Sequence, residues 1–111
     1  MRAGNGTKPW GEVATLIMAA LADADRHGYA IVAAVREMSN GSVELGTGTL
    51  YGALERLLDA RCVSAGGDEV VDGRLRRYYH LTEYGRGVLD DELTRAEALA
   101  AAARLRLAGG A

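Results

Sequence analysis

Apolar residues recur at spacings of three and four in four stretches of the chain, a pattern that is typical of amphipathic helices. The pattern therefore predicts four helices, at about Trp10–Ala22, His27–Met38, Gly46–Ala60 and Glu83–Leu107. Pro9 is favourable at the start of the first helix, and Asn40 or Gly41 can take the left-handed conformation that ends the second. The caps expected at the starts of the other three helices are Asp25, Thr47 or Thr49, and Thr82.

The same spacing predicts which side of each helix is buried. In the first helix the expected core positions are Val13, Leu16, Ile17, Ala20 and Leu21. In the second helix they are Tyr29 or Ala30, Ile31, Ala34, Val35 and Met38. In the third helix they are Leu50, Ala53, Leu54 and Leu57.

The third helix has an unusual outer face. Its other side carries Thr47, Gly48, Thr49, Tyr51, Gly52, Glu55 and Arg56. A helix that only needed to be soluble would carry Glu, Lys and Ala there, because a glycine inside a helix costs roughly 1 kcal/mol relative to alanine. Gly48 and Gly52 therefore suggest a face that another molecule approaches closely.

A β-hairpin is expected between the third and last helices. Asp72-Gly73, which lies between short apolar segments, is a strong signal for a two-residue turn. We expect residues 66–73 to be loop-like and Arg74–Leu81 to return as a strand. The packed face of that strand would carry Leu75, Tyr79 and Leu81, and the other face Arg74, Arg76, Tyr78 and His80. A further short extended segment, Val43–Leu45, is expected before the third helix.

The last helix is too long for the preceding residues to cover. At 1.5 Å per residue it spans about 37 Å, and its apolar residues form a heptad stripe. The stripe consists of Leu89, Leu93, Ala96, Ala100, Ala103 and Leu107. We expect this stripe to pair with that of a second copy of the chain. Trp10 is expected in the core or at the same interface, and the alternative is that it lines an effector pocket. Packing within one chain is the alternative, although no other segment is long enough to cover the stripe.

The order of these elements is that of a winged helix-turn-helix, so the expected fold is mainly α with a small β-hairpin wing. In that architecture the third helix enters the major groove of DNA with its N-terminal residues. The wing arginines would neutralise backbone phosphates, which adds affinity and salt dependence but little sequence information. The candidate DNA contacts are Thr47, Gly48, Thr49, Tyr51, Gly52, Arg56, Arg74, Arg76 and Arg77. We expect a disordered N-terminus (1–8), a winged DNA-binding domain (9–81), a dimerisation helix (82–107) and a tail (108–111).

Charge and cysteine content narrow the function further. Thirteen basic and fifteen acidic side chains give a net charge of −2, which argues against a protein that coats nucleic acid indiscriminately. Acidic residues near the hairpin tip strengthen the alternative that the arginines lie on a solvated strand face, although we prefer contact of the arginines with DNA. The single cysteine, Cys62, excludes an internal disulfide and is expected to be buried in a reducing compartment, the cytoplasm. No apolar run has the length of a membrane span or a signal peptide.

No catalytic site, metal site or cofactor is expected. No nucleophile accompanies a candidate base, and Gly46-Thr47-Gly48 lacks the later glycine and lysine of a nucleotide-binding loop. His80 has no cysteine or histidine at metal-ligand spacing. We expect His27 to be a structural residue at a helix start, hydrogen-bonded to nearby backbone.

Three motifs resemble those of the PadR-like transcriptional regulators. They are His27-Gly28-Tyr29, then Gly48-Thr49-Leu50-Tyr51 with Leu54 and Leu57, and the run RYYHLTEYG from Arg77 to Gly85. The resemblance covers about Trp10–Leu93. It implies a cytoplasmic, dimeric repressor that often releases its operator when a small molecule binds.

Carried over by position, the resemblance implies that Thr49 and Tyr51 contact DNA and that Tyr79 is a core residue. Two features depart from the family pattern. Gly52 stands where many relatives carry proline, and the last helix has no aromatic residue after Tyr84 on which a flat apolar ligand would stack.

Two functions are therefore carried forward. The first is a dimeric, sequence-specific DNA-binding regulator that reads an inverted repeat, because two third helices on a two-fold axis read half-sites about one helical turn apart. The alternative is a winged-helix module that binds another protein and not DNA, which the net acidity favours. A steep loss of DNA affinity with salt distinguishes the first from the second.

Overall fold

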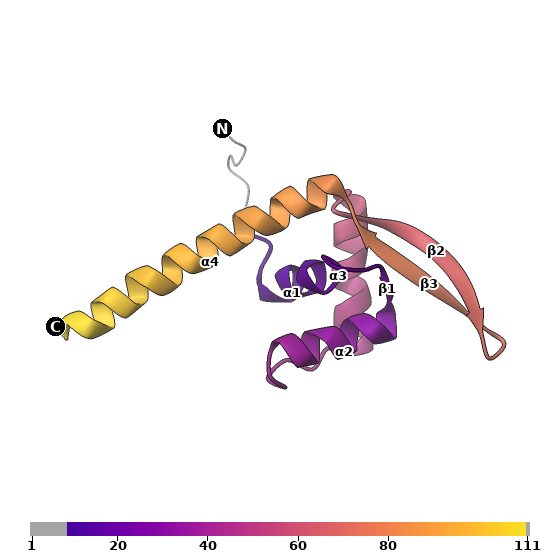
Figure 1. Cartoon of the computed structure of the whole chain (residues 1–111), viewed down its shortest axis with the longest axis horizontal. Helices are drawn as coiled ribbons and strands as arrows, with labels where there is room; N and C mark the ends of the chain where they lie inside the picture. The colour runs from indigo at the N-terminus through magenta and orange to yellow at the C-terminus, as the bar shows by residue number, and fades with distance from the viewer. Residues whose placement is uncertain (1–8, 111) are drawn as a thin grey trace.

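Four helices and a three-stranded antiparallel sheet make up residues 9–110, the part of the chain that the computed structural model describes. In chain order the elements are α1 (Glu12–Ala20), β1 (Arg26–His27), α2 (Gly28–Met38), α3 (Thr47–Asp59), β2 (Val63–Val71), β3 (Arg74–Leu81) and α4 (Glu83–Gly109). Figure 1 shows α1, α2 and α3 grouped together, with the β2–β3 hairpin projecting on one side and α4 extending away on the other. The predicted disorder of residues 1–8 lies outside the described residues.

The sheet has the strand order β1-β3-β2. The long hairpin pairs from Val63 with Leu81 to Val71 with Arg74, with an irregularity between Ala65 and Gly67. Asp72 (φ 52°) and Gly73 (φ 75°) both adopt the left-handed conformation of a two-residue hairpin turn, as predicted.

Two expectations about extended segments were wrong. Residues 66–71 are not a loop, because β2 runs through them to Val71. Most of this strand is exposed on both faces, so its hydrophobic pattern is weak and its pairing with β3 holds it. Val43–Leu45 forms no strand. The third strand is β1, whose Arg26 and His27 pair with Tyr79 and Tyr78.

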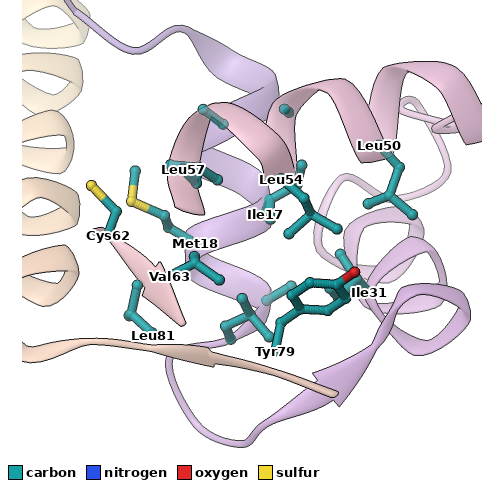
Figure 2. Close-up of a cluster of buried hydrophobic side chains, with 14 of the residues drawn as sticks. Ile17, Met18, Ile31, Leu50, Leu54, Leu57, Cys62, Val63, Tyr79 and Leu81 are labelled. Carbon is teal, nitrogen blue, oxygen red and sulfur yellow. The ribbon is translucent and has the colours of Figure 1, made fainter. Parts of the chain in front are cut away.

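The core lies where the three short helices meet the inner ends of β2 and β3. The predicted stripe of α3 is confirmed, since its four apolar residues are each 3% exposed or less. Figure 2 shows Leu54, Ile17, Val63 and Tyr79 grouped at this junction. Cys62 is fully buried, as expected, and burial raises the pKa of its thiol. Tyr79 is a core residue, as the family resemblance implies.

Several helix ends differ from the expected ones. The first helix begins at Glu12, not Trp10, with Gly11 as its N-cap. The cap of α2 is His27 instead of Asp25, because β1 continues the chain to that residue. The cap of α3 is Gly46 without a side-chain hydrogen bond, so Thr47 and Thr49 are not caps. The predicted cap at the start of α4 is confirmed, as its hydroxyl accepts a hydrogen bond from the amide of Gly85.

Burial along α2 and β3 also differs in part from the pattern. Ile31 and Val35 are fully buried, but Tyr29 is 80% exposed and Met38 is 44% exposed. The buried residue in the first turn of α2 is Gly28. Leu75, which pairs with Val70 close to the hairpin turn, is 64% exposed and does not lie on a packed face.

Only the first turns of α4 are covered by the rest of the described chain. Its buried residues are Gly85, Leu89 and Glu92. A Cβ atom at Gly85 would collide with the carbonyl of Cys62 and lie 2.8 Å from a methyl of Leu81, so this contact requires glycine. The helix continues to Gly109, two residues past its expected end, and stops at Gly110 in the left-handed conformation.

Candidate nucleic-acid interface and subunit interface

The outer face of α3 is open to solvent. Thr47, Gly48, Thr49 and Gly52 are all exposed, and the buried stripe on the opposite side holds the helix in place. A Cβ atom at Gly48 or Gly52 would meet nothing within 4 Å in the described chain. Their lack of side chains is therefore not needed for packing inside one chain, so the close approach that the sequence indicates would come from outside.

Tyr51 links this face to the start of α2. Its side chain is 46% exposed, and its hydroxyl lies so close to Gly28 that a Cβ atom there would collide with it. The buried glycine of the His27-Gly28-Tyr29 motif thus leaves room for Tyr51. The phenol stands at the boundary between the outer face of α3 and the sheet.

A groove of about 570 Å³ lies between the start of α2, α3 and β3. Six of its lining residues are His27, Tyr29, Tyr51, Arg74, Arg76 and Arg77. The groove therefore joins one candidate contact of α3 to all three wing arginines. Its lining carries several hydrogen-bond donors and three positive charges.

The three arginines have different environments. The Nη1 atom of Arg76 is 3.0 Å from Nε2 of His27, and its side chain is partly buried. The Nε atom of Arg77 is 3.6 Å from Oδ1 of Asp68 in an ion pair that is largely exposed. Arg74 directly follows the hairpin turn and is exposed.

Two acidic residues of the hairpin are engaged within it. Asp68 pairs with Arg77, and Glu69 accepts a hydrogen bond of 2.6 Å from the hydroxyl of Tyr78. This hydrogen bond to a carboxylate raises the pKa of Tyr78. Desolvation raises the pKa of the buried Tyr79 phenol. The acidity near the wing tip is therefore partly offset by the wing's own side chains.

Arg56 lies over the ring of Trp10, away from the groove that the wing arginines line. Its guanidinium carbon lies 5.5 Å from the centre of the Trp10 ring, a cation–π arrangement. Trp10 is partly buried against the core. The predicted DNA contact Arg56 thus lies over a residue that was predicted for the core or subunit interface, and its role as a DNA contact remains a prediction.

The heptad stripe of α4 is mostly uncovered. Leu93 is 43% exposed and Leu107 is 80% exposed, and Ala96, Ala100 and Ala103 between them are exposed as well. Leu89 is only 7% exposed, so its own chain already covers it. Two exposed leucines lie off the stripe, Leu99 (71%) and Leu105 (75%). Leu99 adjoins the stripe and Leu105 lies on the opposite side of α4, so exposed apolar residues are not confined to the stripe.

Glu92 is a structural residue that the sequence pattern did not single out. Its side chain is 8% exposed, and Oε2 accepts hydrogen bonds from the amide of Trp10 (2.9 Å) and from Nη2 of Arg95 (2.7 Å). It therefore ties the segment before α1 to α4. Its heptad position gave no signal, because it adjoins the stripe at a place usually held by a solvated charge.

A second groove, of about 710 Å³, runs between α1 and α4 beside this contact. Its lining is largely apolar and includes Pro9, Leu16, Ala96 and Leu99. Within residues 9–110 no three side chains of the types that bind metals lie together. In the same part of the chain, no helix combines the length and apolar character needed to cross a membrane.

Helix α3 with its open face and the adjoining hairpin define a winged-helix protein. The family model described as "Transcriptional regulator PadR-like family" matches residues 17–91, which is more than half of the chain. A protein of Lysinibacillus sphaericus, uncharacterised protein X, is 30% identical over 81 residues, which cover 73% of this chain and 74% of that protein. The chain therefore belongs to the PadR-like family of transcriptional regulators.

Solved structures agree with this assignment. A PadR family transcription regulator from Clostridium difficile R20291 is 30% identical, has a TM-score of 0.75, and the match covers 87% of this chain and 99% of that chain. Bacillus subtilis PadR, solved in complex with operator DNA, matches with a TM-score of 0.65 at 21% identity over 73% of this chain and 46% of that chain, a likeness of fold. The expected family and fold class are confirmed, and the family comprises regulators and not enzymes.

Proposed function

We propose that this protein is a dimeric transcriptional regulator that binds double-stranded DNA. The outer face of α3 would enter the major groove with Thr47, Gly48, Thr49, Tyr51 and Gly52. The β2–β3 hairpin would lie along the backbone as a wing, with Arg74, Arg76 and Arg77 near phosphates. The observation that carries the proposal is the open glycine and hydroxyl face of α3, next to a groove that all three wing arginines line.

The proposed dimer rests on α4. Most of its stripe is exposed apolar surface that nothing in the described chain covers, and the two-fold pairing of identical stripes would bury it on both subunits. Pairing would set two α3 helices on a common axis. Such a dimer reads an inverted repeat whose half-sites are about one helical turn, or a multiple of it, apart.

The groove between α1 and α4 is the proposed place for a small apolar effector. It adjoins the dimer stripe, since Ala96 lines it. A molecule bound there would alter the angle between the two winged domains only if it binds one arrangement more tightly than the other. The proposed protein is thus a repressor that releases its operator when the effector binds. Its proposed location is the cytoplasm.

The second candidate is a winged-helix module that binds another protein. The net charge of −2 favours it. The acidic residues near the hairpin tip also favoured it, but this argument is weakened because two of them already have partners. Asp68 pairs with Arg77, and Glu69 accepts a hydrogen bond from Tyr78. We therefore favour DNA as the partner.

The test is a salt titration with duplex DNA from upstream of the protein's own gene. We expect specific binding whose affinity falls at least a hundredfold between 50 and 200 mM salt, because several phosphates are neutralised at once. A duplex of scrambled sequence is the control, and binding to it should be weaker at every salt concentration. DNA binding that does not change with salt, or the absence of DNA binding, would contradict the proposal. Capture of a protein partner under the same conditions would favour the protein-binding module.

A further inference from the structure

The pair His27 and Arg76 joins the start of α2 to β3. The Nδ1 atom of His27 faces the amide of Ala30 at 3.3 Å, as an N-cap. The Nε2 atom lies 3.0 Å from Nη1 of Arg76, and the ring stands edge-on to Tyr78 with centroids 5.3 Å apart. Both ring nitrogens thus face nitrogen atoms that carry hydrogen.

These two contacts of His27 are not compatible with one neutral ring. A neutral imidazole has one N–H donor and one acceptor nitrogen, and a guanidinium has donors only. If Nδ1 accepts from Ala30, the ring proton is on Nε2 and points at Arg76. Donor then faces donor, and the contact lacks an acceptor atom. An oxygen with two lone pairs, placed beside both groups, would accept from each.

The surroundings of the pair supply few acceptors. The guanidinium groups of Arg74 and Arg77 and the phenol of Tyr51 line the same groove. The acid opposite Arg76 on the neighbouring strand is Glu69, its pairing partner in the sheet. Its Oε1 already accepts from Tyr78 at 2.6 Å, and it makes no ion pair with Arg76 in the described chain.

We infer that His27 and Arg76 together bind one phosphate of the DNA backbone, with Nε2–H of His27 and the guanidinium of Arg76 donating to it. This inference rests on the proposed function. The structure confirms that His27 caps a helix. The inference adds a second role, a direct contact with DNA that the sequence did not indicate. The contact would lie at the junction of α2 and β3, between α3 and the hairpin tip. It would fix the position of the wing on the DNA relative to α3.

The test separates the two roles of His27. His27→Asn keeps an N-cap, because asparagine is among the best capping residues, and removes the Nε2 donor. Arg76→Gln removes the charge. Arg104→Gln, on the exposed end of α4, is the control for the same change in net charge. Each protein is titrated with the upstream duplex and with a scrambled duplex of equal length, over a range of salt concentrations.

We expect Arg76→Gln to lower affinity about tenfold and to reduce the slope of log K against log salt by about 0.9 per subunit. His27→Asn should lower affinity roughly threefold to tenfold with an unchanged slope, because a neutral donor displaces no counterion. Both losses should be equal on the two duplexes, since phosphate contacts carry no sequence information. The double variant should lose less than the product of the two, because both groups share one phosphate.

An NMR spectrum of the ring nitrogens of His27 gives a second measurement. Its signals should not change on DNA binding if the role of His27 is purely structural. We expect the proton on Nε2 in the free protein and a shift of that signal when duplex is added. Wild-type affinity in His27→Asn, unequal losses on the two duplexes, or an unmoved ring signal would overturn the inference while the proposed function stands. If the wild-type protein itself shows no salt-sensitive DNA binding, the proposed function fails and this inference fails with it.

Discussion

Helices α3 and α4 each leave one face bare, and the two bare faces differ in kind. On α3 the apolar stripe is buried and the exposed side offers hydroxyls, glycines and Tyr51. On α4 the core covers only Gly85, Leu89 and Glu92. The exposed stripe beyond them consists of leucine and alanine.

The difference indicates two kinds of partner. Polar groups and bare backbone gain little from an apolar surface, but they allow close approach to a hydrated, hydrogen-bonding partner such as DNA. An apolar stripe at heptad spacing gains from burial against a matching stripe. The difference therefore supports the proposed function, in which α3 binds DNA and α4 binds a second copy of the chain.

The largest expected effect is on α4. Ala100→Glu places a carboxylate in the stripe, and a two-fold dimer would bury it on both subunits. We expect dimerisation to weaken about a thousandfold, or ~4 kcal/mol, as measured by sedimentation. Ala98→Glu, the same change on the opposite side of the helix, should leave the dimer intact. Equal effects of the two changes would mean that the stripe is not the interface.

A change of similar size is expected inside α4. Gly85→Ala would force a methyl group against the carbonyl of Cys62, so we expect a loss of about 3 kcal/mol in the free energy of unfolding. Gly87→Ala is the matched control, because a Cβ atom there meets nothing within 4 Å. It should be neutral or stabilising by up to about 1 kcal/mol. Denaturant unfolding of both variants measures the difference.

A smaller loss is expected at Glu92. Glu92→Ala removes the acceptor for the Trp10 amide and for Arg95, which should lower the free energy of unfolding by about 2 kcal/mol. Hydrogen exchange should also be faster in the segment before α1. Glu97→Ala, on an exposed position of the same helix, should change stability by less than about 0.5 kcal/mol. Equal stability of the two variants would refute the anchoring role of Glu92.

The smallest change in stability is expected on α3, with the opposite sign. Gly48→Ala and Gly52→Ala should each raise the free energy of unfolding by up to about 1 kcal/mol, because alanine favours a helix and the space is open. Each should also weaken DNA binding at least threefold, since a methyl group would separate the helix from the duplex. Gly87→Ala, which should be neutral or stabilising, should leave DNA binding unchanged. Wild-type DNA affinity in both α3 variants would mean that these glycines do not lie in the DNA interface.

Local patterns predicted much of this fold. The buried stripe of α3, the Asp72-Gly73 turn and the cap at Thr82 depend on residues a few positions apart, so periodicity and turn chemistry were sufficient. The motif resemblance led to the correct family. The candidate residues of α3 and the hairpin arginines followed from the same patterns, and their role in binding DNA remains a prediction.

The errors occurred where contacts between distant segments decided the outcome. His27 replaced Asp25 as the cap because pairing with Tyr78 drew the chain before α2 into the sheet. Asp25 instead contacts His80, 55 residues away. Residues 66–71 form a strand because β3 pairs with them, although their own sequence favours a loop.

The sequence by itself determined the four helices, the hairpin turn and their order, because these follow from the spacing of residues within one segment. Only the tertiary structure decided that Glu92 is buried as an anchor, that Tyr51 lies over Gly28, and that His27 faces Arg76. Each of these contacts joins side chains from different elements. Their positions depend on how helices and sheet pack in three dimensions, which no spacing along the chain records.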